Sequence, residues 1–468
     1  ADLVDEGTFH EYGGLAVAGQ RQRHSLQSLI ERTPADGVVT GTGSVNGLCV
    51  IVGYDYTVWA GTQGHQGHRK VTRMLELAHR RRLPVVIFGE GGGGRAGETD
   101  GLNAFGLDIP TWRQLGLLSG VVPLVGVVAG YSFAGNAAML GGCDVIIATQ
   151  DSSLGMGGPA MIEGGGLGTF TPDEVGPMAV QGPNGVVDLV VEDDRAAVAA
   201  ARRYLSYFQG RAETYGSADQ TLLRDAVPEN RARSYDMRAV VDLLTDTASV
   251  LELRKDFGPS IITALGRVEG WPLGIVASNP MALGGAIDSA AADKMTRFVR
   301  VCETFDLPVL SLCDTPGILV GPEAEKEATV RHAARLFVAT ASLRVPLLCV
   351  VLRKAYGLGA QAMFGGSVHA PFFTVAWPTA QFGSMGVEGM VRLGFRRELD
   401  QLEDEDERRR FFDEQARSIY EKGSALTAAT YFELDDVIDP ADTRSWIATA
   451  LHNPRATPGP ASRPIDPW

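Results

Sequence analysis

The sequence predicts an α/β protein made of two diverged copies of one unit. Short apolar segments of strand length alternate with segments that carry apolar residues at helical spacing. Related segments recur in the same order in both halves of the 468-residue chain. The composition, with 45% hydrophobic and 21% charged residues, is that of a globular protein with a sizeable core.

Three pairs of matching segments define the repeat, and the members of each pair are separated by 223 or 224 positions. They are 36–47 and 259–270, 83–90 and 307–314, and 122–128 and 345–351. A fourth pair, 185–191 and 433–439, is spaced more widely because the second half carries an extra charged segment at about 396–422. The repeat predicts one domain over residues 1–230 and a second over residues 231–468.

Each copy is expected to open with a strand followed by a helix. The strands are predicted at 48–53 and 271–277. The core-facing residues of the two helices are Val71, Met74, Leu75 and Ala78, and Met295, Phe298, Val299, Cys302 and Phe305. Asp288 and Ser289 supply N-cap chemistry ahead of the second helix. This alternation implies parallel strands joined by helices that cover the sheet.

The segments outside the repeat receive simpler interpretations. Residues 201–258 connect the copies, with helical patterning over 238–253. The mixed charges of 396–422 indicate an exposed helix with a solvated or subunit-contacting face. The proline-rich tail that begins at His452 lacks periodicity and is expected to be loosely held.

Charge and composition exclude several classes of function. The net charge of −14 argues against a nucleic-acid partner. No apolar run of about 18 residues predicts a membrane span, and the acidic N-terminus lacks the features of a signal peptide, so we expect a cytoplasmic protein. Five widely spaced cysteines without a CxxC pair predict buried free thiols. His65 and His68 lack a third ligand, so no metal is expected.

Two glycine-containing turns carry the strongest functional signal. In each half, a strand runs into a turn of small residues, 130–138 or 353–362, and an apolar helix follows. A helix N-terminus presents unpaired N–H groups with positive partial charge, and small residues let a substrate oxygen approach them. Such an oxyanion hole can contribute about 3 kcal/mol per donor. One turn of this kind could need glycine for packing alone, but two matched turns favour function.

Further glycine-rich loops accompany these turns. They are 89–98, 314–319, 154–159 and 383–389. The first resembles a phosphate cradle without the Lys-Ser/Thr of a P-loop, and the context of a dinucleotide fingerprint is missing. Within it, Arg95 could meet an anionic ligand or pair with Glu90 or Glu98. Residues 68–70 could likewise supply positive charge for a phosphate.

The chemistry that the sequence lacks is also informative. No GxSxG elbow is found, which disfavours a hydrolase triad. No paired carboxylates lie in the glycine turns to serve as acid and base. The pattern therefore indicates that backbone dipoles stabilise oxyanions and that the proton is handled elsewhere.

Six segments, taken in order, resemble the carboxyltransferase (beta) component of biotin-dependent acyl-CoA carboxylases of the acetyl-/propionyl-CoA type. They are 5–12, 36–41, 92–95, 314–317, 353–357 and 385–389. The resemblance covers nearly the whole chain. It implies two tandem crotonase-like (ClpP/crotonase) domains of the ββα-superhelix type, the N-terminal one on the acyl-CoA side and the C-terminal one on the biotin side.

The resemblance also implies the reaction. Carboxybiotin passes CO2 to the α-carbon of an acyl-CoA, and the biotin nitrogen collects the α-proton. By position, Gly135 and Asn136 would face the thioester oxygen, and Leu358 and Gly359 would face the biotin oxygen. The other residues assigned to cofactor binding are Gly93, Gly94, Arg95, Ala134, Gly157, Gly158, Thr315, Pro316, Gly317, Tyr356, Gly357, Ala360 and Gln361.

Partners follow from what the chain lacks. Neither a Met-Lys-Met biotinylation motif nor an ATP-binding biotin carboxylase region is visible. Carboxybiotin is therefore expected on a separate carrier protein or on another part of a larger polypeptide from which this chain derives. The expected partners are biotin carboxylase and the biotin carboxyl carrier subunit or domain. The resemblance implies a homohexamer built as a trimer of dimers, with no nucleic acid, membrane or metal involved.

Three departures from the family pattern concern the glycine loops. Glu90–Arg95 replaces Asp-Ser-Gly-Gly-Ala-Arg, Gly135-Asn136 replaces Gly-Gly, and 355–360 replaces Ala-Tyr-Gly-Gly-Ala-Tyr. No proline is introduced, so the backbone donors survive. The changes make Gln361 and its neighbours candidate specificity positions.

Three alternative functions remain open from the sequence. The first is a carboxyacyl-CoA decarboxylase that uses the same site in reverse. The second is a non-catalytic structural subunit, suggested by the altered turns. The third is a biotin-independent hydratase, which is disfavoured because the first glycine turn contains no glutamate.

Overall fold

The computed structural model describes residues 2–100, 107–452 and 465. The chain divides into two compact units, with the change from the first to the second after Gln209. The sequence placed this boundary after residue 230. The intervening segment belongs to the second unit through contacts such as the hydrogen bond from the Ala212 N–H to the Gly270 carbonyl, 2.9 Å. Ile465 is grouped with the first unit.

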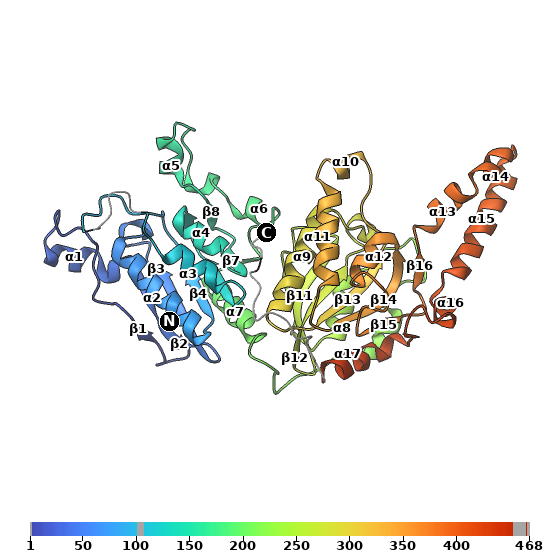
Figure 1. Cartoon of the computed structure of the whole chain (residues 1–468), viewed down its shortest axis with the longest axis horizontal. Coiled ribbons are helices and arrows are strands. Elements are labelled where there is room, and N and C mark those ends of the chain that lie inside the picture. The colour runs from blue at the N-terminus through green and yellow to red at the C-terminus, as the bar shows by residue number, and fades with distance from the viewer. Residues whose placement is uncertain (1, 101–106, 453–464, 466–468) are drawn as a thin grey trace. The chain divides into compact units, whose positions relative to one another are not determined.

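The first unit is built on a seven-stranded sheet in the order β1-β2-β3-β4-β5-β7-β9 (Figure 1). β1, β2 and β3 pair antiparallel, and the remaining neighbours are parallel. A second, two-stranded sheet joins β6 and β8. The strands are β1 (His10–Glu11), β2 (Val38–Ser44), β3 (Leu48–Tyr54), β4 (Val85–Phe88), β5 (Leu124–Val128), β6 (Tyr131–Phe133), β7 (Val145–Thr149), β8 (Ser153–Gly155) and β9 (Leu189–Val191).

Helices cover the sheet of the first unit and bury its core. They are α1 (Leu26–Arg32), α2 (His65–Arg81), α3 (Thr111–Leu118), α4 (Gly135–Gly141), α5 (Pro159–Gly164), α6 (Met178–Gln181) and α7 (Asp194–Ser206). The short 3-10 helices are η1 (Pro34–Gly37), η2 (Trp59–Gly61) and η3 (Pro172–Glu174). All four residues predicted for the inner face of α2 are fully buried against β3, β4 and β5, which confirms the helical pattern.

The second unit repeats this topology in an eight-stranded sheet. The order is β10-β11-β12-β13-β14-β15-β17, with β16 paired to β14. The strands are β10 (Leu251–Leu253), β11 (Ile261–Val268), β12 (Trp271–Ser278), β13 (Val309–Thr315), β14 (Leu347–Tyr356), β15 (Phe373–Ala376), β16 (Gln381–Gly383) and β17 (Asp436–Val437). The long β14 takes the places of both β5 and β6, because its first part pairs with β13 and β15 and its last part with β16. The internal repeat is therefore a repeat of structure.

The helices of the second unit follow the same plan with additions. They are α8 (Met237–Leu244), α9 (Ser289–Thr304), α10 (Pro322–Glu325), α11 (Thr329–Ala341), α12 (Gly357–Met363), α13 (Val387–Gly394), α14 (Arg396–Gln401), α15 (Glu405–Lys422), α16 (Ala425–Thr430) and α17 (Thr443–Leu451), with 3-10 helices η4 (Gln220–Asp225), η5 (Leu283–Gly285) and η6 (Pro440–Asp442). Asp288 caps α9 as predicted, accepting a hydrogen bond from the Ala291 N–H at 2.8 Å. The helix predicted over 238–253 ends at Leu244, so the prediction was wrong for the residues that follow. Thr245 is the C-cap with extended backbone, and β10 begins at Leu251.

The charged segment forms an arm that extends from the sheet of the second unit (Figure 1). Ala416 is the buried residue of α15 and packs with Val387 and Val391 of α13. Partly buried side chains of α15, among them Phe412 and Ile419, pack against the same cluster, and the rest of the helix is mostly exposed. The predicted exposed helix is confirmed. It is held by a small apolar cluster of its own, which the charge pattern did not reveal.

The described residues also report on the other expectations from composition. All five cysteines are buried and free, and burial raises the pKa of Cys49 to about 12. None of the helices in the described ranges has the length and apolarity to cross a membrane. Most of the proline-rich tail lies outside the described residues. Ile465 is described and buried, and its N–H donates to the Ser119 hydroxyl at 3.0 Å.

One buried lysine makes a prediction about stability. Lys294 of α9 is 1% exposed, and its ammonium has no hydrogen-bond partner among the described residues. Burial lowers its pKa to about 7; Glu252 and Asp256 act against this lowering, and Arg238 and Arg254 act with it. The unfolded chain therefore binds more protons than the folded chain between about pH 7 and the ordinary lysine pKa. Stability should rise with pH across that window, by up to about 1.4 kcal/mol per pH unit.

We expect Lys294→Met to raise the melting temperature at pH 7 and to flatten its rise with pH. The reason is that methionine fills similar space without a charge to desolvate. Melting of both proteins from pH 7 to 9.5 measures the two slopes. Equal slopes would show that Lys294 does not titrate in this range.

Candidate active site

The first glycine turn joins β6 to α4. Ala134 caps the helix with a positive φ of 50°, and its N–H donates to the Gly155 carbonyl of β8 at 3.1 Å. The N–H groups of Gly135 and Asn136 donate to no acceptor among the described residues. The turn therefore presents two unpaired donors at a helix start.

A companion loop lies directly against this turn. The Gln63 N–H donates to the Gly93 carbonyl at 2.6 Å, and the Arg95 N–H donates to the Gln63 carbonyl at 2.9 Å. Because alternate residues of an extended segment point to opposite sides, the N–H of Gly94 faces away from Gln63 and has no acceptor among the residues described. A Cβ on Gly93 would lie only 3.2 Å from the nitrogen of Gly135. Glycine at 93 thus brings the two loops together.

The second turn joins β14 to α12. Gly357 has a φ of 55°, and a Cβ there would lie 2.9 Å from the Ser384 carbonyl oxygen. The N–H groups of Leu358 and Gly359 donate to no acceptor within the described part of the chain. The side chain of Leu358 is 64% exposed, so its backbone lies at the surface of the unit.

The second turn has its own companion loop with the same hydrogen bonding. The Ile287 N–H donates to the Gly317 carbonyl at 3.0 Å, and the Leu319 N–H donates to the Ile287 carbonyl at 2.8 Å. The N–H of Ile318 between them is left without a described acceptor. A Cβ on Gly359 would lie 2.6 Å from the carbonyl carbon of Gly317.

The two contacts are equivalent, since 93 corresponds to 317 and 135 to 359, both 224 positions apart. Each unit therefore contains one amide pair, Gly94 with Gly135 and Ile318 with Gly359. The sequence reasoning missed Ile318. Applying the repeat spacing to Gly94 would have found it. The same spacing shows that Asn136 corresponds to Ala360. From the sequence, Gly135 and Asn136 were expected to match Leu358 and Gly359, which lie one residue earlier.

A carboxylate anchors the strand before each turn. Glu90 accepts a hydrogen bond from the Ala129 N–H at 3.2 Å, and burial raises the pKa of this carboxyl. Asp314, at the equivalent position, is fully buried and accepts from the Lys354 N–H at 3.1 Å and from Nε of Arg353 at 3.1 Å. These groups are bonded to the backbone that precedes the turns, which explains why they do not form an acid–base pair.

The positive charge of Arg95 is paired within the first unit. Arg95 forms ion pairs with Asp36 and, at 3.5 Å, with Glu98, and it stacks on the Trp59 ring. Of the two partners expected from the sequence, it therefore meets Glu98 and not Glu90.

Residues 68–70 do not form a free basic patch either. The ammonium of Lys70 donates to the Ala35 carbonyl at 2.8 Å. Burial lowers the pKa of His68 to about 4, and its ring contacts the Thr111 hydroxyl at 3.2 Å. The suggestion of local positive charge for a phosphate is wrong for these two side chains. No group of three or more His, Cys, Asp or Glu that could hold a metal occurs in the described ranges.

The remaining candidate residues surround the two turns. In the first unit, Gly158 caps α5 and packs on the Phe133 ring, and Gly157 precedes it. In the second unit, the Thr315 hydroxyl donates to the Gly285 carbonyl at 2.7 Å, whereas Pro316 is exposed. Tyr356 caps α12 and is buried, which raises the pKa of its hydroxyl.

A pocket of about 670 Å³ opens beside the second turn. Its apolar lining includes Leu358, Phe364, Val368, Phe382 and Phe432. Ala360 and Gln361 of α12 lie on the same wall, and His369 stacks on the Phe432 ring.

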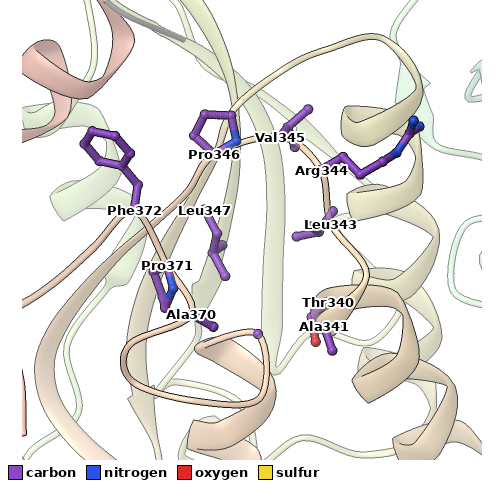
Figure 2. Close-up of a pocket in the computed structure, with 11 residues that line it drawn as sticks. Thr340, Ala341, Leu343, Arg344, Val345, Pro346, Leu347, Ala370, Pro371 and Phe372 are labelled. Carbon is purple, nitrogen blue, oxygen red and sulfur yellow. The ribbon is translucent and has the colours of Figure 1, made fainter. Parts of the chain in front are cut away.

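A smaller pocket of about 230 Å³ lies at the other end of β14 (Figure 2). Figure 2 shows Ala370, Pro371 and Phe372 on one side of it, with Pro346 and Leu347 next to them, and Thr340, Ala341, Leu343, Arg344 and Val345 on the other. Leu347 begins β14 and Tyr356 ends it, so this pocket is separated from the second turn by the length of the strand. Its arginine, Arg344, forms an ion pair with Glu303 at 3.1 Å. It is not part of the candidate active site.

Comparison with known proteins decides the family. The family model described as "Carboxyl transferase domain" matches residues 2–461. The chain belongs to this family. The methylmalonyl-CoA carboxyltransferase 12S subunit of Propionibacterium freudenreichii subsp. shermanii is 34% identical over 462 residues, which are 96% of this chain and 86% of that protein. The chain is therefore an enzyme component, the carboxyltransferase of biotin-dependent acyl-CoA carboxylases.

Solved structures carry the same conclusion for the fold. The structure of a single-chain, multi-domain long-chain acyl-CoA carboxylase superposes on this carboxyltransferase with a TM-score of 0.91 at 55% identity, covering 96% of this chain and 45% of that one. This carboxyltransferase thus spans less than half the length of that relative. The transcarboxylase 12S hexamer superposes with a TM-score of 0.85 at 31% identity, covering 99% of this chain and 90% of that one. The crotonase-like fold expected from the sequence is confirmed.

The close contact between Gly359 and Gly317 predicts that this carboxyltransferase tolerates no side chain at position 359. We expect Gly359→Ala to lower kcat at least 100-fold, because backbone cannot yield as a flexible side chain can, and a shift of about 1 Å in a catalytic donor has an effect of this size. Gly394→Ala is the matched control, since a Cβ there meets nothing within 4 Å. Similar kcat values for the two variants would contradict the role of the contact.

Proposed function

We propose that this chain transfers CO2 from carboxybiotin, held on a separate carrier protein or domain, to the α-carbon of an acyl-CoA thioester. The observation that supports the proposal is the presence of two equivalent amide pairs, one in each unit, that find no acceptor among the described residues. Unpaired amides at helix starts are suited to oxygens that become negative during a reaction. Carboxyl transfer between a thioester and a urea generates two such oxygens.

Each turn stabilises one of the two oxygens. The N–H groups of Gly94, Gly135 and Asn136 stabilise the enolate oxygen of the thioester, and those of Ile318, Leu358 and Gly359 stabilise the ureido oxygen. When bound, carboxybiotin supplies CO2 by cleavage of its N–carboxyl bond, and the freed nitrogen takes the α-proton that the thioester loses as it becomes the enolate. The chain's residues hold both oxygens in place and contribute about 3 kcal/mol per donor. No side-chain base is needed, in agreement with the anchoring roles of Glu90 and Asp314.

Donor geometry also favours catalysis over a purely structural role. The family pattern is altered at both turns, yet neither turn has lost its unpaired N–H groups. The side chains that changed lie around the donors, and the donors themselves belong to the backbone. The same arrangement serves decarboxylation of a carboxyacyl-CoA, which is the reverse half of the reaction.

Assembly is the remaining requirement. The two reactants must meet during the transfer, so both turns must face the same active site. We propose that copies of the chain bring the turns together in a homohexamer arranged as a trimer of dimers. The transcarboxylase 12S relative is described as a hexamer. The proposed partners are biotin carboxylase and a biotin carboxyl carrier subunit or domain, working in the cytoplasm.

The proposal is tested by the reverse reaction with free biotin. Incubation of the chain with biotin and malonyl-CoA or methylmalonyl-CoA should release the decarboxylated thioester and form carboxybiotin. Forward transfer is then measured with the carrier and biotin carboxylase present. No turnover in either direction, across short and long acyl-CoAs, would refute the assignment.

The pocket beside the second turn supports a long acyl chain as substrate. The α-carbon must face the biotin side, so the chain that continues from it passes the second turn, where Phe432 and Leu358 line an apolar hollow. The relative that shares 55% identity is a long-chain acyl-CoA carboxylase. Each buried methylene contributes about 0.8 kcal/mol, so a pocket of this kind discriminates by chain length.

We expect Phe432→Asp to lower kcat/KM for a C16 acyl-CoA at least tenfold and to leave propionyl-CoA nearly unchanged. Phe372→Asp is the matched control, because Phe372 is 61% exposed against 68% for Phe432 but borders the pocket at the other end of β14. The measurement is kcat/KM against chain length from C2 to C16. A loss that is equal at all lengths would place the acyl chain elsewhere.

A further inference from the structure

Two buried carbonyl groups occupy equivalent places behind the glycine loops. They belong to Gly61 in the first unit and to Gly285 in the second, 224 positions apart. Both residues have positive φ, and a Cβ on either would lie 2.5 Å from the carbonyl oxygen that ends the neighbouring strand, that of Glu90 or Asp314. A buried carbonyl requires a hydrogen-bond donor, so each unit must supply one.

The two units supply this donor from different positions. In the second unit, the Thr315 hydroxyl donates to the Gly285 carbonyl at 2.7 Å. In the first unit, the equivalent of Thr315 is Gly91, which has no side chain, and the donor is the side-chain amide of Asn136 at 3.1 Å. The equivalent of Asn136 in the second unit is Ala360, which has nothing to donate.

The two solutions exclude each other sterically. Gly91 has a φ of 136°, and a Cβ on it would lie 2.1 Å from the Gly61 carbonyl oxygen and 2.5 Å from Nδ2 of Asn136. The same amide also donates to the Glu90 carbonyl at 2.6 Å. Asn136 is fully buried, so both bonds are formed out of contact with solvent. A side chain at 91 and an asparagine at 136 cannot coexist in this geometry.

We propose that Gly91 and Asn136 are a compensating pair, in which Asn136 acts as the positioning residue of the first amide pair. Its side chain ties the carbonyls of Gly61 and Glu90 to the first turn of α4. This holds the N–H groups of Gly94 and Gly135 in register. The inference rests on the proposed function and deepens it, because it assigns the side chain of Asn136 to the loops and leaves only its backbone N–H to the substrate.

The pair also unites two differences between the two units. The second unit has threonine at the place of Gly91, and alanine at the place of Asn136. Taken separately, each change removes or adds a polar group near the reacting oxygen. Taken together, they move one donor from the loop to the helix and keep the carbonyl satisfied. The altered turn is thereby accounted for without loss of the reaction.

The test is a double-mutant cycle in the assembled enzyme. Asn136→Ala removes the side-chain donor and should lower kcat about 10- to 100-fold, because the N–H groups of the loop are no longer held in the orientation that the oxyanion requires. The KM for acyl-CoA should change little, because the contacts with CoA remain. Gly91→Ser alone should lower kcat as well, because its Cβ would clash with the Asn136 amide and with the Gly61 carbonyl oxygen. The double variant should recover part of the lost kcat, because without Asn136 the backbone at 91 can take the strand conformation of Thr315 and the introduced hydroxyl can take the role that Thr315 has in the second unit.

Two controls make the cycle specific. Asn184→Ala removes an exposed amide that donates to Gln181 and accepts from the Val186 N–H, and it should leave kcat unchanged. The mirror pair in the second unit, Thr315→Gly with and without Ala360→Asn, should show the same loss and recovery. A crystal structure of the double variant in the first unit reports directly whether the introduced hydroxyl lies within hydrogen-bond distance of the Gly61 carbonyl oxygen.

The outcomes separate this inference from the proposed function. A wild-type enzyme without carboxyl transfer would refute the function, and the crystal structure would then decide the pair by itself. An active wild type whose Asn136→Ala variant melts earlier but keeps its kcat would overturn the positioning role. So would a double variant that is no more active than Asn136→Ala.

Discussion

The close approach of backbone to backbone at two points holds the candidate site together. In the first unit, a Cβ on Gly93 would lie 2.6 Å from the Cβ of Ala134 and 3.2 Å from the nitrogen of Gly135; in the second, a Cβ on Gly359 would lie 2.6 Å from the carbonyl carbon of Gly317. Each contact places a loop N–H next to the N–H groups at a helix start. Such donors cost no rearrangement when a charge develops beside them, because the sheet and the helix already hold them in place. The surrounding structure can be understood as the support of these two contacts.

The groups that hold these loops occupy equivalent positions in the two units but differ in chemical type. Glu90 and Asp314 stand at equivalent strand ends and both bond to the backbone ahead of a turn, although Asp314 adds a buried contact with Arg353 and Glu90 has a pKa raised by burial. The carbonyls of Gly61 and Gly285 are satisfied by an amide in one unit and by a hydroxyl in the other. Backbone geometry is thus maintained while the side chains that maintain it have diverged.

This division explains how a carboxyltransferase can differ from its relatives at its glycine turns. A reaction that depends on backbone donors tolerates changes in nearby side chains as long as the loops keep their path. The chain-length preference that we propose is a separate matter, because it depends on the apolar wall beside the second turn that includes Phe382 and Phe432. The two properties are carried by different atoms, so one can change without the other.

Much of this organisation was determined by the sequence alone. The repeat, the strand–helix order, the buried face of α2 and the cap of α9 all follow from local patterns, because spacing and capping act over a few residues. The glycine turns at Gly135 and Gly359 were also found, since their small residues stand out against strand and helix.

Other features were decided only by the tertiary structure. The end of α8 at Leu244, the ion pair of Arg95 with Asp36, the role of Ile318 and the exchange of donors between Thr315 and Asn136 depend on residues that are far apart in the chain. A local pattern contains no record of which distant loop will lie against a given backbone group. Burial then sets the requirement that each carbonyl or carboxylate finds a partner, and the fold selects which residue supplies it.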